Sequence, residues 1–185
     1  MSHGGDIIRE LTTDHREVDE LFDQFAAAPS GSERRRELAD TLTIELVRHS
    51  VAEEEHLYPA VREHVEGGDA LADKEIADHA RVEELLKALE GKAPDDEGFD
   101  RLVATLRTED TAHVRDEEDN LFVRLQDATH PYILESLGEK VREAKKTAPT
   151  RPHPGAPSTP PANKLLAPGL GLVDRARDLV TRRGA

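Results

Sequence analysis

The chain contains no cysteine and no tryptophan, and only 3% of its 185 residues are aromatic. Without cysteine there can be no disulfide bond, zinc–thiolate site, iron–sulfur cluster or thiol nucleophile. Any bound metal must therefore be held by histidine and carboxylate side chains. Apolar residues make up 36% of the chain, which predicts a modest and mainly aliphatic core under a highly charged surface.

Long apolar segments are also missing. No run of 18 residues is apolar, and the first five residues, Met-Ser-His-Gly-Gly, lack the basic and apolar parts of a secretory signal. We therefore expect neither membrane insertion nor export, and a cytoplasmic location. A length of 185 residues predicts one ordinary domain with a tail left over.

The net charge of −14 is spread unevenly along the chain. Residues 140–185 hold ten basic and three acidic residues, a net charge of +7, which leaves −21 on residues 1–139. A body this acidic repels phosphate backbones, so we expect no nucleic-acid partner. The basic tail could bind a partner or a membrane surface, but docking back onto the acidic body is favoured.

Apolar residues recur at intervals of three and four in residues 6–28, from Ser32 to about Pro59, in residues 69–89 and in residues 99–125. Pro59 is expected to kink or stop the second helix, and Pro131 to begin a short fifth helix. No segment alternates convincingly with a period of two, so no strand is predicted. Four long helices joined by short turns predict an all-α fold, an up-down-up-down four-helix bundle.

The C-terminal tail has a different composition. Residues 147–168 contain seven prolines, which predicts an extended linker. Residues 169–185 are expected to form a short basic helix. Its apolar face would carry Leu172, Val173, Ala176, Leu179 and Val180. The predicted organisation is therefore a bundle over residues 1–146, a proline-rich linker over 147–168 and a helix over 169–185.

The first two-thirds of the chain repeat themselves. An offset of 64 residues, without a gap, superposes segments of the same chemistry: Asp14-His15 on Asp78-His79, and His49-x-x-x-Glu53-Glu54 on His113-x-x-x-Glu117-Glu118. Apolar positions between these segments coincide as well. The sequence therefore predicts a duplicated helical hairpin that carries His and Glu in matched places.

The duplicated His and Glu residues have a spacing that suits metal binding. Residues four apart on a helix differ by about 40° in direction and about 6 Å in height, so both side chains can reach one ion. A single His-x-x-x-Glu pair is most often a solvated surface pair. Here all four His fall in the apolar stripe and the arrangement occurs twice, which favours metal. The metal-ligand candidates are His15, His49, Glu53, His79, His113 and Glu117. Iron suits these ligands best, with manganese as the substitute.

These residues resemble a known family. The four His and two Glu, together with Glu54-Glu55-His56-Leu57-Tyr58-Pro59 and its echo Glu118-Asp119-Asn120-Leu121-Phe122, look like a hemerythrin-like, cation-binding HHE domain over residues 6–130. The resemblance implies two non-heme iron ions within a four-helix bundle. His15 and His49 would bind one iron and His79 and His113 the other. Glu53 and Glu117 would bridge them, with an oxo or hydroxo group completing the bridge.

One position departs from the oxygen carriers of this family. They present a second His four residues after the one on the third helix, and here that position is Glu83. The departure argues against reversible oxygen carriage. Glu83 is either a solvated helix residue, as the matching Asp19 suggests, or an additional carboxylate that favours ferric iron.

Several further residues have more than one interpretation. His56 returns to nearly the face of His49, so it is either a weak iron ligand or a residue that lies against the ligands. Tyr58 is expected in the core, with a hydrogen bond to the site as the lesser alternative. Four other histidines are expected at the surface: His3, His64, His130 and His153.

Three classes of function remain open: a redox enzyme, a binding protein and a metal-free structural bundle. The missing fifth His favours redox chemistry on hydrogen peroxide or nitric oxide species, with catalase- or peroxidase-like activity in oxidative or nitrosative stress. Its ligands would be peroxide or small diatomic molecules. The alternative is a protein that binds or senses oxygen or iron without turnover.

Overall fold

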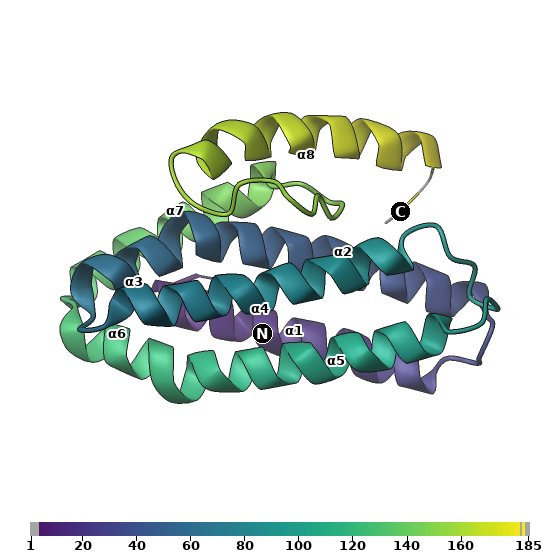
Figure 1. Ribbon diagram of the computed structural model, residues 1–185, viewed down its shortest axis with the longest axis horizontal. Coiled ribbons are helices and arrows are strands. Elements are labelled where there is room, and N and C mark those ends of the chain that lie inside the picture. Colours follow the sequence, from purple (N-terminus) through teal and green to yellow (C-terminus); the bar gives the residue numbers. More distant parts are fainter. Residues whose placement is uncertain (1–3, 182, 184–185) are drawn as a thin grey trace.

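The computed structural model describes residues 4–181 and 183, and over these residues it contains helices and no strand. Four long helical stretches run up and down beside one another and are joined by short loops (Figure 1). The predicted all-α bundle is therefore confirmed. None of the helices in this part of the chain is both long and apolar enough to span a membrane. His3, expected at the surface, lies outside the described residues.

The four stretches follow the expected order along the chain. They are α1 (Ile7–Ala27), α2 (Glu33–Ala52) continued by η1 (Glu53–Leu57) and α3 (Tyr58–His64), α4 (Gly68–Leu89), and α5 (Phe99–Asp116) continued by η2 (Glu117–Leu121) and α6 (Phe122–Ala128). Side-chain caps set two of the starting points, because Asp6 accepts from the Arg9 backbone N–H and Ser32 accepts from that of Arg35. Helix α7 (Pro131–Thr147) then packs along α1 and α2.

The segments η1 and η2 are single π-helical turns, and each begins at a glutamate of the repeated motif. The backbone N–H of Tyr58 bonds to the carbonyl of Glu53, five residues back, and that of Phe122 bonds in the same way to Glu117. We expected Pro59 to kink or stop the second helix, but the helix continues to His64. In the π turn the backbone N–H before Pro59 bonds to the carbonyl five residues back instead of four. The helical hydrogen bonds are thus already rearranged where the proline lacks its N–H, and the helix continues.

Two apolar clusters fill the bundle, one towards each end. The first includes Ile7, Leu11, Leu57, Leu121, Leu125 and Val141, and the second includes Phe22, Leu42, Leu86, Phe99 and Leu106. Between them lies a layer of buried polar side chains: His15, His49, Glu53, His79, His113 and Glu117. The apolar ends stabilise the fold by removing hydrocarbon from water, and they hold the polar layer away from solvent.

The tail differs from the predicted boundaries. Helix α8 (Ala162–Thr181) begins at Ala162 rather than at residue 169, so the extended segment covers only residues 148–161. Pro168 lies inside α8, where it removes one backbone hydrogen bond. The helix tolerates this loss because its inward face is anchored on the rest of the chain. Figure 1 shows α8 as an outer layer along the bundle.

Two acidic side chains anchor α8. Asp174 is fully buried, and its Oδ2 accepts hydrogen bonds from Thr150 N at 3.2 Å, Arg151 N at 3.1 Å and His153 Nε2 at 2.9 Å. Asp178 accepts from Thr150 Oγ1 at 2.5 Å and pairs with Arg151 at 2.7 Å. His153 is therefore half-buried and hydrogen-bonded, not the free surface residue that the sequence suggested.

The helix also lies very close to the end of α7. A Cβ added at Gly171 would come within 2.2 Å of the Thr147 carbonyl oxygen, so only glycine permits this approach. Two ion pairs join the tail to the acidic body, Arg151 with Glu90 at 2.8 Å and Arg183 with Asp40 at 2.9 Å. Charge attraction thus contributes to docking on the bundle, while the buried acids of α8 hold the extended segment to α8.

The apolar face expected to line one side of the tail helix points outward. Leu172, Val173 and Leu179 are 68%, 56% and 83% exposed, and Ala176 is exposed too. The side chain of Val180 lies outside the described part of the chain. The inward face of α8 instead carries Asn163, Ala167, Gly171, Asp174 and Asp178.

Replacing Asp174 with Ala should release the tail. The change leaves two buried backbone N–H groups and His153 without their acceptor, and each unsatisfied group costs about 1–3 kcal/mol. We expect limited proteolysis within residues 148–161 to become at least roughly tenfold faster, since about 1.4 kcal/mol corresponds to a factor of ten. Arg177→Ala, an exposed change on the same helix, is the control. Equal cleavage rates in the two variants would contradict this account of docking.

Candidate metal centre

Four imidazoles meet in the polar layer between the two apolar clusters. The Nε2 atoms of His15 and His49 are 3.2 Å apart, and those of His79 and His113 are also 3.2 Å apart. Each pair joins a residue near the middle of one helix to a residue one turn before a π turn. Two nitrogens at this separation can bind one ion, because metal–nitrogen bonds are about 2.1 Å long.

Two carboxylates lie between the imidazole pairs. Glu53 Oε1 is 3.1 Å from His49 Nε2, and Glu53 Oε2 is 3.2 Å from His79 Nε2, so this one side chain spans both pairs. Glu117 Oε2 lies 3.5 Å from His15 Nε2 and 3.6 Å from His113 Nε2. Both side chains are fully buried. Each π turn begins at one of these glutamates, so the register change coincides with the carboxylates that link the two halves.

The phenol of Tyr58 completes the inner layer. Its hydroxyl lies 2.9 Å from His79 Nε2 and donates to Glu117 Oε1 at 3.1 Å. Burial raises the pKa of Tyr58 well above its usual value, and the charges of Glu117, Glu53 and Glu75 raise it further. The group therefore stays a neutral hydroxyl. The sequence suggested a packing role for this residue, while the structure places its oxygen among the candidate ligands.

A second set of carboxylates orients the imidazoles from outside. In each ring Nδ1 faces an acid: His15 with Glu118 at 2.8 Å, His49 with Asp14 at 3.2 Å, His79 with Glu54 at 3.1 Å, and His113 with Glu75 at 2.8 Å. An acid at Nδ1 favours the tautomer that carries its hydrogen there, which leaves the Nε2 lone pair directed at the centre. Metal-binding histidines in proteins are usually held in this way.

The buried oxygens show that the layer suits a cation. Glu117 Oε2 is buried without a hydrogen-bond partner, and Glu53 Oε1 faces the lone pair of His49 Nε2 rather than a hydrogen. An unsatisfied buried carboxylate is very unfavourable unless a positive charge faces it. Three overlapping groups bring their ligand atoms within 4.8 Å of one another: His15, His49, Glu53 and Glu117; Glu53, His79 and His113; and Glu75, His113 and Glu117. Nitrogen and oxygen ligands in this number fit a divalent or trivalent transition metal.

Comparison with known proteins agrees with this geometry. Residues 6–125 match the hemerythrin HHE cation-binding domain. The chain belongs to this family. An uncharacterized hemerythrin-like protein of Schizosaccharomyces pombe is 25% identical over 170 residues, which cover 91% of this chain and 83% of the relative. A hemerythrin HHE cation-binding domain-containing protein from Mycobacterium kansasii has a crystal structure that superposes with a TM-score of 0.67. It is 26% identical, over 76% of this chain and 85% of that one.

A third relative is a protein named DNA nickase from a Nostoc species, which is 30% identical over 142 residues. The match covers 76% of this chain but only 38% of the relative. The chain thus spans well under half of that protein. What the comparisons share is the hemerythrin-like domain, a module that binds metal cations.

In this hemerythrin-like site the imidazoles and the carboxylates shift one another's pKa values. Burial alone would lower the pKa of His79, but hydrogen bonds that the ring donates to Glu53 and Glu54 raise it to about 10. The pKa of His49 is likewise raised well above its usual value, against burial, by Glu53 and Asp14. The pKa of Glu53 is held well below its usual value, again against burial, by His49 and His79. The imidazoles and carboxylates of the layer therefore each favour the charged form of the other.

The two additional candidate ligands lie outside all three groups in the described part of the chain. His56 lies beside Glu55 at 3.7 Å, and burial, with Lys164 and Lys140 nearby, lowers its pKa to about 4. Glu83 accepts a hydrogen bond from His153 N at 2.7 Å and so faces the tail. The π turn accounts for His56, because one extra residue per turn rotates it away from the face of His49.

The sequence did not predict which acids face the imidazole Nδ1 atoms, although the repeat relates two of these acids. Glu54 and Glu118 are repeat partners, and each holds the first His of the opposite half. Asp14 holds His49, so the repeat would predict that Asp78 holds His113. Asp78 instead pairs with Lys74 at 3.0 Å and with Arg81, and Glu75 takes its place.

The difference between Glu75 and Asp78 supplies a test. Glu75→Gln removes the charge that orients His113 and should weaken metal binding by about 10- to 100-fold while the fold is retained. Asp78→Asn, one turn away on the same helix, should leave metal affinity unchanged. Competition against a chelator measures both affinities. An equal loss in the two variants would mean that general acidity, rather than the contact with His113, controls affinity.

Proposed function

We propose that this hemerythrin-like protein holds two non-heme iron ions and that the pair acts on hydrogen peroxide or nitric oxide species. The observation that carries this proposal is the pairing of imidazoles. Two Nε2 pairs, each 3.2 Å apart, face Glu53, whose two oxygens point one to each pair. One ion per imidazole pair, with Glu53 shared between them, satisfies every one of these atoms.

Each half of the site would hold one ion. His15 and His49 would bind the first, and His79 and His113 the second, while Glu53 and Glu117 bridge. Histidine nitrogen mixed with carboxylate oxygen, without thiolate, suits iron, with manganese as the substitute. When bound, the two irons would supply redox chemistry and Lewis acidity.

The outer acids bias such a site towards the oxidised metal. Four carboxylates sit on the imidazole Nδ1 atoms and two more lie between the pairs. Negative charge around a metal stabilises its higher oxidation state. The sequence left open whether Glu83 is a solvated residue or a source of this charge, and in the structure Glu83 faces the tail. The acids at Nδ1 provide it instead, and they disfavour a lasting ferrous–oxygen complex.

Peroxide suits the interior better than larger substrates. The inner layer is buried between two apolar clusters, and the only hydroxyl that the described residues place among the ligand atoms is that of Tyr58. This hydroxyl can donate a hydrogen bond to a small oxygen-containing molecule held between the pairs. Disproportionation of two peroxide molecules to two waters and one dioxygen needs proton movement of this kind.

Two other functions are less well supported. Binding or sensing of oxygen or iron without turnover is the alternative, and it would use the same ligands. Nucleic acid is not an expected partner, because residues 1–139 carry a net charge of −21 and would repel phosphate. The name of the Nostoc relative does not change this inference, since most of that protein lies outside the match.

Iron content tests the proposed centre. After expression with sufficient iron, we expect two irons per chain and the near-ultraviolet absorption of an oxo-bridged diferric pair. His49→Ala should lose iron and lower the melting temperature together, because metal stabilises only the folded state. His56→Ala should keep both irons, because His56 lies outside the ligand groups. Well under one iron per wild-type chain, with no such absorption, would refute the centre.

Oxygen evolution tests the chemistry. The iron-loaded protein should release dioxygen from hydrogen peroxide faster than the same concentration of free iron. Tyr58→Phe should keep its iron but slow this release by roughly 100-fold, the usual effect of losing a positioned proton donor. Parallel measurements with nitric oxide distinguish the two proposed substrates. Reversible cycling between deoxy and oxy spectra, without turnover, would instead support oxygen binding.

A further inference from the structure

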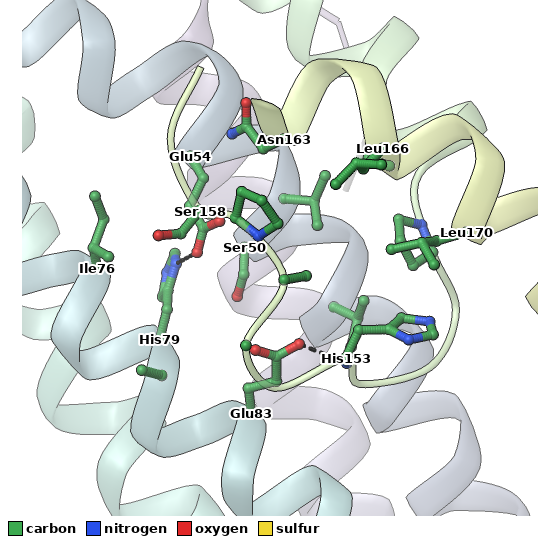
Figure 2. Close-up of a pocket in the computed structure, with 18 of the residues that line it drawn as sticks. Ser50, Glu54, Ile76, His79, Glu83, His153, Ser158, Asn163, Leu166 and Leu170 are labelled. Atoms are coloured by element: carbon green, nitrogen blue, oxygen red, sulfur yellow. Dashed lines mark hydrogen bonds and ion pairs between the residues drawn. The ribbon is translucent and has the colours of Figure 1, made fainter. Parts of the chain in front are cut away.

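A cavity of about 250 Å³ lies between the bundle and the C-terminal tail. Helices α2 and α4 form its floor, and the extended segment with the first half of α8 covers it (Figure 2). Its residues include Glu54 and His79 at the edge of the candidate metal centre. The space exists because the tail docks, since Pro149, His153, Pro157 and Leu170 form the outer walls.

Most of the wall is apolar. Side chains from the floor and the cover contribute: Val47, Val51, Ile76, Val82, Leu86 and Leu170. An apolar cavity of about 150 Å³ is enough to bind benzene, so this one can take a single ring with a small substituent. Peroxide or a diatomic gas would leave most of this space unfilled.

Two residues of the cavity wall have a buried donor without a partner in the described structure, Asn163 at Nδ2 and Arg151 at Nε. Asn163 is only 5% exposed, and its side-chain Nδ2 forms no hydrogen bond in the described structure. Its Oδ1 accepts from Lys164 N at 2.7 Å, so the amide nitrogen is the end of the side chain that lacks a partner. A buried donor without an acceptor costs about 1–3 kcal/mol. A ligand oxygen would remove that cost.

An acceptor lies at the same end of the cavity. Figure 2 shows Asn163 and Glu54 together above His79, on the side away from Leu170. Glu54 already accepts from His79 Nδ1, but a carboxylate has room for about four hydrogen bonds. Glu83 adds a second acidic group to the wall. The cationic Arg151 is paired with Glu90 and Asp178, so it does not offset these acids.

These features define one class of ligand. A carboxylate or phosphate would be repelled by Glu54 and Glu83, and an amine would offer nothing to the Asn163 donor. A hydroxyl can accept from Asn163 and donate to Glu54 at once. We propose that the cavity binds a neutral hydroxylated ring compound of about the size of phenol, with its hydroxyl between Asn163 and Glu54.

This binding site goes beyond the proposed function and does not depend on it. The ligand would touch Glu54, the acid that orients His79. His79 also borders the cavity, while the other five candidate metal ligands are not part of its wall. Binding can therefore be measured whether or not the centre holds iron. Loss of iron would leave this proposal intact, and loss of binding would leave the metal centre intact.

The test uses 4-methylphenol, toluene and 4-methylbenzoate as probes on the full chain, both as isolated and after metal removal. Ligand-observed NMR and calorimetry should show that 4-methylphenol binds at least roughly tenfold more tightly than toluene, the effect of about one hydrogen bond. The benzoate should not bind. Asn163→Leu should reduce the preference for 4-methylphenol over toluene by roughly tenfold. Leu165→Ala, an exposed change on the same helix, should leave it unchanged.

A second variant distinguishes loss of the binding site from detachment of the tail. Val51→Phe fills the cavity from the floor and should abolish binding of both 4-methylphenol and toluene, while limited proteolysis of the tail stays as in the wild type. The proposal is wrong if 4-methylphenol binds no better than toluene. It is also wrong if Asn163→Leu keeps the full preference, or if Val51→Phe binds as the wild type does.

Discussion

The burial of six ionisable side chains in one layer is the constraint on which the rest of the structure depends. Four imidazoles and two glutamates lie between two apolar clusters, where water cannot solvate them. Charges in such a place are tolerated only when each one is paired. Carboxylates on the outer nitrogens satisfy one side of every imidazole, and the inner nitrogens are left facing Glu53 and Glu117. The helices must therefore supply an acid for the Nδ1 atom of every imidazole. The Nε2 atoms and the oxygens of Glu53 and Glu117 then form a set of ligands that suits a cation.

The π turns follow from the same constraint. Each begins at a central glutamate and carries the helix on as one continuous element past the site. Duplication places these turns opposite one another, but the two halves are not identical. Tyr58 brings a hydroxyl to His79, whereas its repeat partner Phe122 stacks on His15 with ring planes 5° apart. Glu75 holds His113, while the matching position in the first repeat is Leu11. The surroundings of the two imidazole pairs therefore differ: a hydroxyl lies beside His79, and an aromatic ring lies beside His15.

The tail covers a cavity whose wall includes Glu54, next to the layer of buried polar side chains. Its own acids, Asp174 and Asp178, hold the extended segment against α8, and that segment covers the floor formed by α2 and α4. Glu54 then has two environments: one oxygen supports His79, and the side chain also borders the cavity beneath the tail. A basic helix that turns its apolar side outward and its acids inward is an unusual arrangement. It is stabilised because the buried acids are hydrogen-bonded: Asp174 accepts from two backbone N–H groups, and Asp178 accepts from Thr150 Oγ1 and pairs with Arg151.

The sequence by itself determined the helices, their order and the six residues of the inner layer, because helical periodicity and an ungapped repeat of 64 residues are local patterns. Tertiary structure alone decided which acids hold the imidazoles, since Glu75 and Asp78 have equally good spacing and only packing separates them. It also decided that His56 and Glu83 turn away from the centre, because a π turn rotates the first and the docked tail engages the second. The outward apolar face of α8 could not be predicted either. An amphipathic pattern shows that two faces differ, but which face is buried depends on the partners that the rest of the chain brings to it.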